Sequence, residues 1–223
     1  MDKNFAKVRL SAEEMRLVTD PAWILTKNSV MGKVVAMFAE LSEAYKLLWA
    51  DGVKRLPAAL PPTEPKISKG ENYKGLPWVM LDYPRVFGRE DVCAIRCMFW
   101  WGHAFSIMLH LKGGYREIFL PGIMERREEL SAAGFGMGIS GDEWAHEHTE
   151  ETYGPLRERG MGEHTWFKLS ARVGLEHWDD APERLSMLYG LLLEVMATTD
   201  RDLSGDGGSL SGGDRGLADD DRR

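Results

Sequence analysis

The clearest pattern of apolar residues runs from Leu76 to Leu111, the part of the chain richest in aromatic and β-branched side chains. Residues of these two kinds favour β-strands, so the segment predicts three strands. A turn signal, Gly102-His103, separates two apolar runs, Val92 to Trp101 and Ala104 to Leu111. We therefore predict a hairpin here and place the core of a sheet in this segment.

Two helices are predicted before the sheet. Ser11-Ala12-Glu13-Glu14 matches a capping box, in which the first and last side chains satisfy backbone amides at the start of a helix. Asp20-Pro21 then ends this helix and begins a second one, with the aspartate as N-cap. The second helix runs to about Ala50, or about 43 Å, so it either crosses the whole sheet or projects toward a partner. Its apolar stripe includes Ile24, Met31, Val35, Phe38, Tyr45 and Trp49.

The remaining segments are assigned from the spacing of their apolar residues and from the prolines and glycines that interrupt helices and strands. Residues 52–75 hold four prolines and follow neither the helical nor the strand period, which predicts a long connection. After Leu111 the pattern predicts a helix interrupted at Pro121 and a short strand in FGMGIS. A strand from Thr165 to Val173 and a last helix from Asp180 to near Thr199 follow.

These elements predict a single α+β domain over residues 1–199. We expect a mostly antiparallel sheet of about five strands, packed by a long N-terminal helix, a middle helix and a C-terminal helix. The domain would consist of a helical part (11–50), the proline-rich connection (52–75) and a sheet-containing part (76–199). Residues 200–223 are mostly Gly, Ser, Asp and Arg and bury almost nothing, so we predict a disordered acidic tail.

Alternation along the strand Val92 to Trp101 gives two faces that are both largely apolar, which indicates a strand covered on both sides. Arg96 is the exception. A buried arginine needs a carboxylate partner, and Asp82 on the neighbouring strand is one candidate. Trp100 and Trp101 send one ring to each face, and one of these rings could anchor a protein partner.

Charge and cysteine content narrow the class of protein. The net charge is −7, and the densest basic cluster lies among glutamates, so nucleic-acid binding is disfavoured. The chain has neither a stretch of signal-peptide character nor about 18 consecutive apolar residues, so we expect no membrane association. Cys93 and Cys97 lie on one predicted strand, too far apart for a disulfide and in a very apolar stretch. We expect inert core cysteines in a cytoplasmic protein.

The most chemically suggestive residues are His146 and His148. On a strand both imidazoles would project from one face and could share a divalent metal, although a polar edge strand or loop with solvated or hydrogen-bonded histidines is the simpler explanation. A second hypothesis is a polar cleft lined by Tyr73, Lys74, Asp82, Arg85 and Arg96. The alternative to this cleft is an ordered entrance to the sheet, in which Asn72 and Gly75 form a turn.

The segments GENYKGLPWVMLDYPRVF, FWWGHAFSIMLHL and DEWAHEH resemble an uncharacterised family of bacterial proteins, between Lys66 and about Tyr153. The resemblance implies a bacterial origin and carries no activity. Because the chain shows no catalytic constellation, we expect a non-enzymatic interaction or assembly module of the bacterial cytoplasm. It would bind a protein partner or self-associate, with Met31, Phe38, Trp100 and Trp101 as contact residues. The alternative is a metal- or small-molecule-binding protein, or an enzyme, with its site at His146 and His148.

Overall fold

The computed structural model describes residues 8–157 and 164–198. Within these residues the five α-helices are α1 (Ala12–Thr19), α2 (Pro21–Gly52), α3 (Gly114–Glu125), α4 (Arg127–Ala132) and α5 (Ala181–Ala197). The strands are β1 (Lys66–Tyr73), β2 (Leu76–Phe87), β3 (Val92–Trp100), β4 (Ala104–Lys112), β5 (Gly136–Gly138), β6 (Tyr153–Gly154) and β7 (Trp166–Gly174). Short 3-10 helices follow α2 (Val53–Arg55) and β7 (Leu175–His177). The predicted tail at 200–223 lies outside the described residues.

The strands form one antiparallel sheet with the order β1-β2-β3-β4-β7-β5-β6. The α+β class and the mostly antiparallel sheet are confirmed, but the described residues contain seven strands rather than about five. The sequence missed β1, which lies inside the segment 52–75 predicted as a connection. An edge strand takes its hydrogen bonds from one neighbour and faces water, so its sequence KISKGENY carries no clear alternation.

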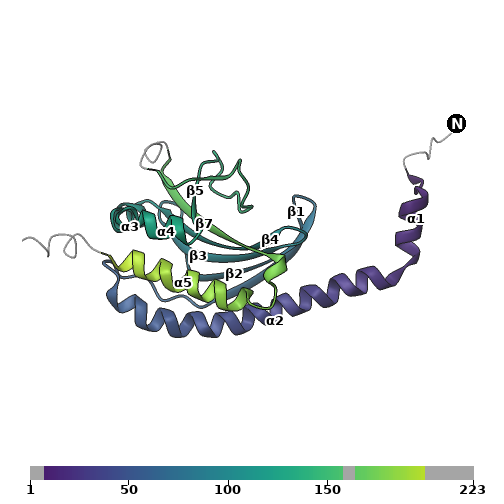
Figure 1. The fold of residues 1–223 in the computed structure, drawn as a ribbon, viewed down its shortest axis with the longest axis horizontal. Helices are drawn as coiled ribbons and strands as arrows, with labels where there is room; N and C mark the ends of the chain where they lie inside the picture. The colour runs from purple at the N-terminus through teal and green to yellow at the C-terminus, as the bar shows by residue number, and fades with distance from the viewer. Residues whose placement is uncertain (1–7, 158–163, 199–223) are drawn as a thin grey trace, which may run out of the picture.

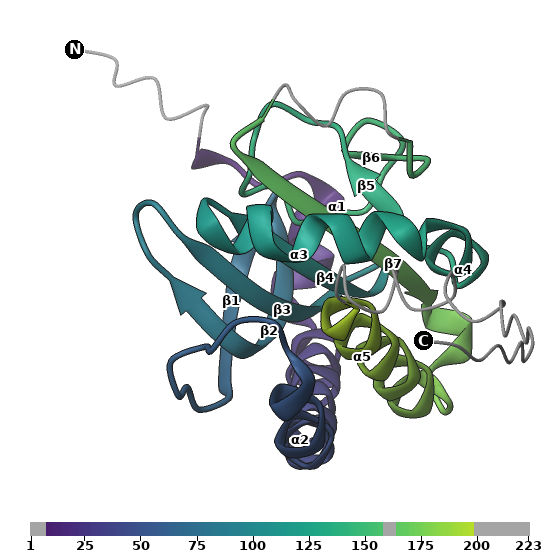
Figure 2. The ribbon, with the colours of Figure 1, turned by 90° about the vertical axis from the view of Figure 1, so that its left-hand side faces the viewer.

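One face of the sheet is covered by helices. In Figure 1, α2 and α5 run beneath the curved sheet, and Figure 2 shows the two helices side by side when α2 is viewed almost end-on. Helix α3 adds Phe119 and Ile123 to the same core. The strand residues that face these helices alternate along β2, β3, β4 and β7, which follows from the two-residue period of a strand. We refer to this side as the helix-covered face.

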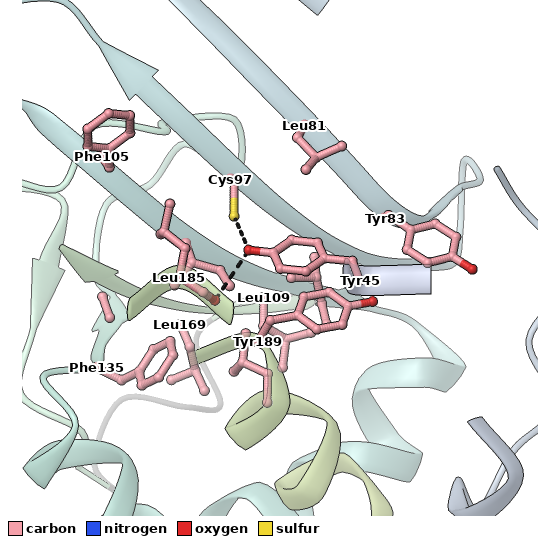
Figure 3. Packing of buried hydrophobic residues seen from close by; sticks show 14 of the residues in the cluster. Tyr45, Leu81, Tyr83, Cys97, Phe105, Leu109, Phe135, Leu169, Leu185 and Tyr189 are labelled. Carbon is pink, nitrogen blue, oxygen red and sulfur yellow. Dashed lines mark hydrogen bonds between the residues drawn. The ribbon is translucent and has the colours of Figure 1, made fainter. Parts of the chain in front are cut away.

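The centre of this core contains a small polar cluster. Tyr45 of α2 stacks on Tyr189 of α5 with ring centroids 3.8 Å apart, and its hydroxyl lies 3.0 Å from Cys97 Sγ. The same hydroxyl donates a hydrogen bond of 3.2 Å to the carbonyl oxygen of Leu185 (Figure 3). Both cysteines are buried and free, as predicted, and burial raises the pKa of each thiol to about 12. They are packing residues.

Helix α2 begins where the sequence predicted. The Asp20 side chain accepts a hydrogen bond from the Ala22 amide, and the capping box of α1 is formed between Ser11 and Glu14. The expectation that Met31 and Phe38 contact a partner is wrong, because these side chains are only 5% and 0% exposed and belong to the core. The sheet covers this side of the helix. The apolar stripe predicts a buried side but does not tell whether the sheet or a partner protein buries it.

The exposed part of α2 is its beginning. Figure 1 shows the N-terminal part of α2 projecting past the edge of the sheet, with α1 turning away at its end. The first buried residue of α2 is Lys27, whose Nζ atom is 2.7 Å from Glu71 on the edge strand β1. None of the helices in residues 8–157 and 164–198 is both long and apolar enough to cross a bilayer.

Candidate functional site

The opposite side of the sheet, here the second face, carries most of the buried polar residues. Because side chains alternate along each strand, the residues between the core positions of β2, β3, β4 and β7 all point to this side. The segment between β5 and β6 lies across it, on the side away from α2 and α5 (Figure 1). The polar residues that the strands place here are Asp82, Arg96, Ser106, His110, Lys168, Ser170 and Arg172.

The ion pair proposed from the sequence is present. Arg96 and Asp82 are opposite each other on β3 and β2, with Arg96 Nε 2.7 Å from Asp82 Oδ1. The guanidinium also lies 3.2 Å from Nε2 of His146 and 5.1 Å from the centre of the Phe87 ring. This buried arginine therefore has both the carboxylate that its burial requires and an aromatic neighbour.

A second group of hydrogen bonds holds Glu147, which is almost fully buried. Tyr73 and Lys74, two residues of the predicted cleft, both donate to its carboxylate, and the Tyr73 hydroxyl accepts from the His146 amide at 2.8 Å. Burial would raise the pKa of Glu147, but the hydrogen bonds from Lys74 and Tyr73 outweigh it and lower this pKa. Burial and the same carboxylate raise the pKa of Tyr73 to about 12. The Glu147 carboxylate is therefore already bonded to Tyr73 and Lys74 of the same chain.

Lys168 on β7 ties the crossing segment to the sheet. Its side chain is buried, and Nζ donates to the carbonyl oxygens of Glu143 at 3.1 Å and Ala145 at 2.5 Å. Burial, with a smaller contribution from the Arg96 charge, lowers the pKa of Lys168 to about 7. Bonds to two backbone carbonyls fix the path of the segment whatever its side chains are.

His110 on β4 is fully buried beneath the same segment. Its ring stands edge-on to Trp144, with centroids 5.2 Å apart, and neither ring nitrogen has a hydrogen-bond partner among the described residues. Burial, followed by the charge of Lys168, lowers the pKa of His110 to about 3, so the imidazole is neutral at pH 7. The 3.7 Å between His110 Nε2 and Glu143 Oε2 is therefore not an ion pair, and Glu143 pairs instead with Lys112 at 3.0 Å.

The two histidines proposed from the sequence lie in this segment, but they contact different groups. His148 Nδ1 is 3.0 Å from Ser170 Oγ, and its ring stacks on Tyr153 with centroids 4.9 Å apart. Nε2 of His146 faces the Arg96 cation, and burial, followed by that charge, lowers the pKa of His146 to about 2. Residues 8–157 and 164–198 contain no group of three His, Cys, Asp or Glu side chains that could hold a metal ion. A shared divalent metal stays a prediction.

A pocket of about 400 Å³ lies beside this network, toward the turn between β3 and β4. Met98, Ser106 and Arg172 line it from three adjacent strands, where they are paired across the sheet. Trp100, on the same strand as Met98, is covered by His103, whose ring stacks on the indole at 3.6 Å. The wall opposite the sheet contains His146, Glu147, His148 and Tyr153. The pocket thus has a floor of mixed apolar and polar side chains and a polar wall.

Two polar atoms of this wall, the Tyr153 hydroxyl beside Ser170 and His146 Nδ1, are fully buried, and His146 Nδ1 has no hydrogen-bond partner among the described residues. An unpaired buried polar group is costly, because it has lost its hydrogen bonds to water. Burial raises the pKa of Tyr153 and lowers that of His148, so the phenol stays protonated and the imidazole neutral at pH 7. The wall therefore presents the neutral rings of His148 and Tyr153 to the pocket, and Arg172 and Glu150 add one basic and one acidic residue to its lining.

The structure brings most of the residues proposed from the sequence into one region. Four of the five residues of the predicted cleft, the histidine pair and Trp100 meet on the second face; the four are Tyr73, Lys74, Asp82 and Arg96. Trp101 instead packs edge-on against Phe99 on the helix-covered side, and Arg85 donates to the carbonyl oxygen of Glu64 at 2.9 Å, away from the site. The turn predicted at Asn72 and Gly75 is confirmed by a 3.1 Å bond from the Gly75 amide to the Asn72 side chain.

Sequence reasoning missed Lys168 and Tyr153. Lys168 lies in the strand predicted from Thr165 to Val173, and the alternation of that strand places it on one face with Ser170 and Arg172. This alternation was a usable signal, because three polar residues at every second position indicate one polar face. Tyr153 had no such signal, since the two-residue strand β6 is too short to show a period.

The chain was compared with known proteins in three ways. A scan against family models, a search of curated proteins and a search of solved structures each found no match.

Proposed function

We propose that the protein binds a small, planar organic molecule in the pocket on the second face of the sheet, and that this molecule is neutral or carries one negative charge. The observation that carries the proposal is the pocket itself, a space of about 400 Å³ that places the apolar side chains of Met98 and Trp100 beside polar residues such as His148 and Arg172. A ligand of matching shape would bury apolar surface there.

The size and lining of the pocket support this class of ligand. A volume of about 400 Å³ lies within the range of small-molecule sites, which combine an apolar surface with a few convergent polar groups. Met98 and Trp100 supply the apolar part, and the stacked rings of His148 and Tyr153 add flat surfaces. Planar ligands suit such walls because offset stacking is favourable.

Charge limits the ligand further. Glu147 is already bonded to Tyr73 and Lys74, and the nearby histidines are neutral because burial lowers their pKa. Arg172 and the exposed acidic residue Glu150 then remain in the lining with opposite charges, which disfavours a ligand with more than one charge. Binding fits this arrangement better than catalysis. The Ser170 hydroxyl bonded to His148 is fully buried, so it is out of reach of a substrate as a nucleophile.

The test is a binding screen with the full chain. A library of aromatic carboxylates, phenols and nucleobases of up to about 20 non-hydrogen atoms is tested by ligand-observed NMR and native mass spectrometry. We expect planar neutral or monoanionic members to bind. Ser106→Leu, which fills the floor of the pocket, should weaken these hits at least about tenfold, since it removes the space that the ligand occupies.

Ser131→Leu on α4 is the matched control, because it makes the same change at an exposed position outside the pocket. It should bind every hit as the parent protein does. An equal loss of affinity in both variants, or an affinity that Ser106→Leu does not change, would show that the ligands bind outside the pocket. A library without a single hit at about 1 mM would contradict the proposal.

The expectation of an interaction or assembly module remains the second candidate function. The specific observation that favours it is the row of exposed apolar residues at the start of α2 and in α1, beyond the edge of the sheet. Contiguous exposed apolar residues are typical of interaction surfaces.

A further inference from the structure

Trp100 is the largest aromatic side chain in the lining of the pocket, and the sheet holds it in place. Its indole Nε1 donates a hydrogen bond of 3.2 Å to the carbonyl oxygen of Tyr73, whose ring meets the indole edge-on with centroids 5.7 Å apart. It also belongs to a buried cluster with Met80, Met98 and Met108. These neighbours lie on strands of the same sheet, so they fix the plane of the indole.

The imidazole of His103 covers this indole in the way a flat ligand would. The two rings are nearly parallel, at an interplanar angle of 7°, with centroids 3.6 Å apart, and both residues line the pocket. Aromatic pairs prefer offset or edge-on arrangements with centroids about 4.5–7 Å apart, so this centred stack is not the most favourable one. Another aromatic ring can therefore compete with the imidazole for the same surface.

His103 is attached to the protein by its backbone rather than by its ring. Its amide donates to the Trp100 carbonyl oxygen at 3.1 Å, and its own carbonyl oxygen accepts a hydrogen bond of 3.1 Å from Arg172 Nη2. The residue is exposed, and within the part of the chain that the structure describes its ring nitrogens form no hydrogen bond. Exposed side chains change rotamer within nanoseconds, so the imidazole can leave the indole while the turn stays in place.

We propose that Trp100 is the stacking platform for the ligand of this pocket, and that His103 is a displaceable cover whose place an aromatic ring of the ligand takes. This inference rests on the proposed function, because it assigns the position of the ligand within the same pocket. It also narrows the class of ligand to molecules with a fused two-ring aromatic system. A fused system covers more of the indole than the five-membered imidazole does, so the exchange buries additional apolar surface.

Nuclear magnetic resonance of the full chain tests the exchange of rings. The probes are three fused-ring molecules, naphthalene-2-carboxylate, indole-3-carboxylate and adenine, each added to about 1 mM. Without a probe, the ring protons of His103 should show Overhauser contacts to the indole of Trp100. With a bound probe, these contacts should be replaced by contacts between the probe and the same indole, while the Met98 methyl signal shifts because the pocket is filled.

The two readouts separate this inference from the proposed function. A shifted Met98 signal with unchanged contacts between His103 and Trp100 would show that the ligand binds without displacing the imidazole. This result would overturn the inference and leave the proposed function intact. No shift with any of the three probes would overturn the fused-ring class of ligand, and the wider library then decides whether the pocket binds another planar molecule.

Removal of the cover gives a second, independent measurement. His103→Ala should tighten the binding of the probes about threefold to tenfold, because the stack on Trp100 no longer has to be broken. His164→Ala is the matched control, since the His164 ring also stacks on an indole, that of Trp166, with centroids 4.6 Å apart and outside this pocket. It should bind the probes as the parent protein does. Unchanged or weaker binding by His103→Ala, or equal tightening in both variants, would overturn the role of His103 as a cover.

Discussion

The two faces of the sheet are built from the same strands but are stabilised by different forces. On the helix-covered face, residues such as Phe38, Phe105 and Leu109 bury apolar surface, which requires shape but little direction. On the second face, buried polar groups such as Arg96 and Lys168 need partners at fixed distances and angles. The first face therefore supplies most of the stability, whereas the second positions chemical groups around a pocket.

This difference between the two faces explains why we expect a ligand to bind on the second face and not on the helix-covered face. An apolar core without room for water offers a ligand no hydrogen bond. The second face combines neutral imidazoles, a phenol, Arg172 and Glu150 around a space of about 400 Å³. A molecule bound in this space could contact both apolar and polar side chains.

The largest contrast should come from one substitution made on each face. Phe38→Ala opens a cavity in the helix-covered core and should lower the free energy of unfolding by about 3–5 kcal/mol. Phe87→Ala on the second face, where the ring is 40% exposed, should lower it by only about 1 kcal/mol. Urea unfolding followed by fluorescence measures both. Similar losses would mean that the faces do not differ as described.

A charge deletion should sharpen the comparison on the second face. Arg96→Met leaves the buried Asp82 carboxylate without its partner and should lower the free energy of unfolding by about 3 kcal/mol. The double variant Asp82→Leu with Arg96→Met should recover most of this loss, because it removes the buried charge as well. The same urea titrations, made as a double-mutant cycle, give the coupling. A double variant no more stable than the single one would contradict this account.

Acid should weaken the second face selectively. The pKa of His110 is about 3 in the folded protein and about 6.5 in an unfolded chain, so between these values the unfolded state binds more protons. The stability from a neutral His110 is thus complete above pH 6.5 and is lost as the pH falls toward 3. His110→Gln should reduce the slope of unfolding free energy between pH 6 and pH 4 by about 1.4 kcal/mol per pH unit. An unchanged slope in urea titrations would show that His110 is protonated while folded.

The smallest effect should come from the polar cluster in the helix-covered core. Tyr45→Phe removes the hydroxyl that bonds to the Leu185 carbonyl and contacts Cys97, and it should cost about 1 kcal/mol. The ring stack on Tyr189 is preserved, so the loss stays near the value of one hydrogen bond. Thermal unfolding by calorimetry can measure it. A decrease in the free energy of unfolding above about 3 kcal/mol would mean that directional hydrogen bonds also contribute strongly to the helix-covered face.

The sequence predicted those features that depend on local chemistry. The capping box at Ser11, the N-cap at Asp20 and the β3–β4 hairpin follow from side chains that act on their own backbone or on nearest neighbours. The ion pair between Asp82 and Arg96 also followed, because a buried arginine requires a carboxylate and the adjacent strand offered one. The α+β class followed from the change along the chain between the helical spacing of apolar residues and the two-residue spacing of strands.

Only the tertiary structure decided which apolar positions are covered. The stripe of α2 has the same character at Ile24 and at Phe38, yet the sheet ends between them, so one is exposed and the other buried. The strand β1 was invisible for a related reason, since an edge strand is specified by its neighbour rather than by its own pattern. The site likewise depends on long-range contacts, because Tyr73, Arg96 and His146 come from three distant segments. Their meeting is set by sheet register and by the path of the segment that Lys168 holds, neither of which is written in any single stretch of sequence.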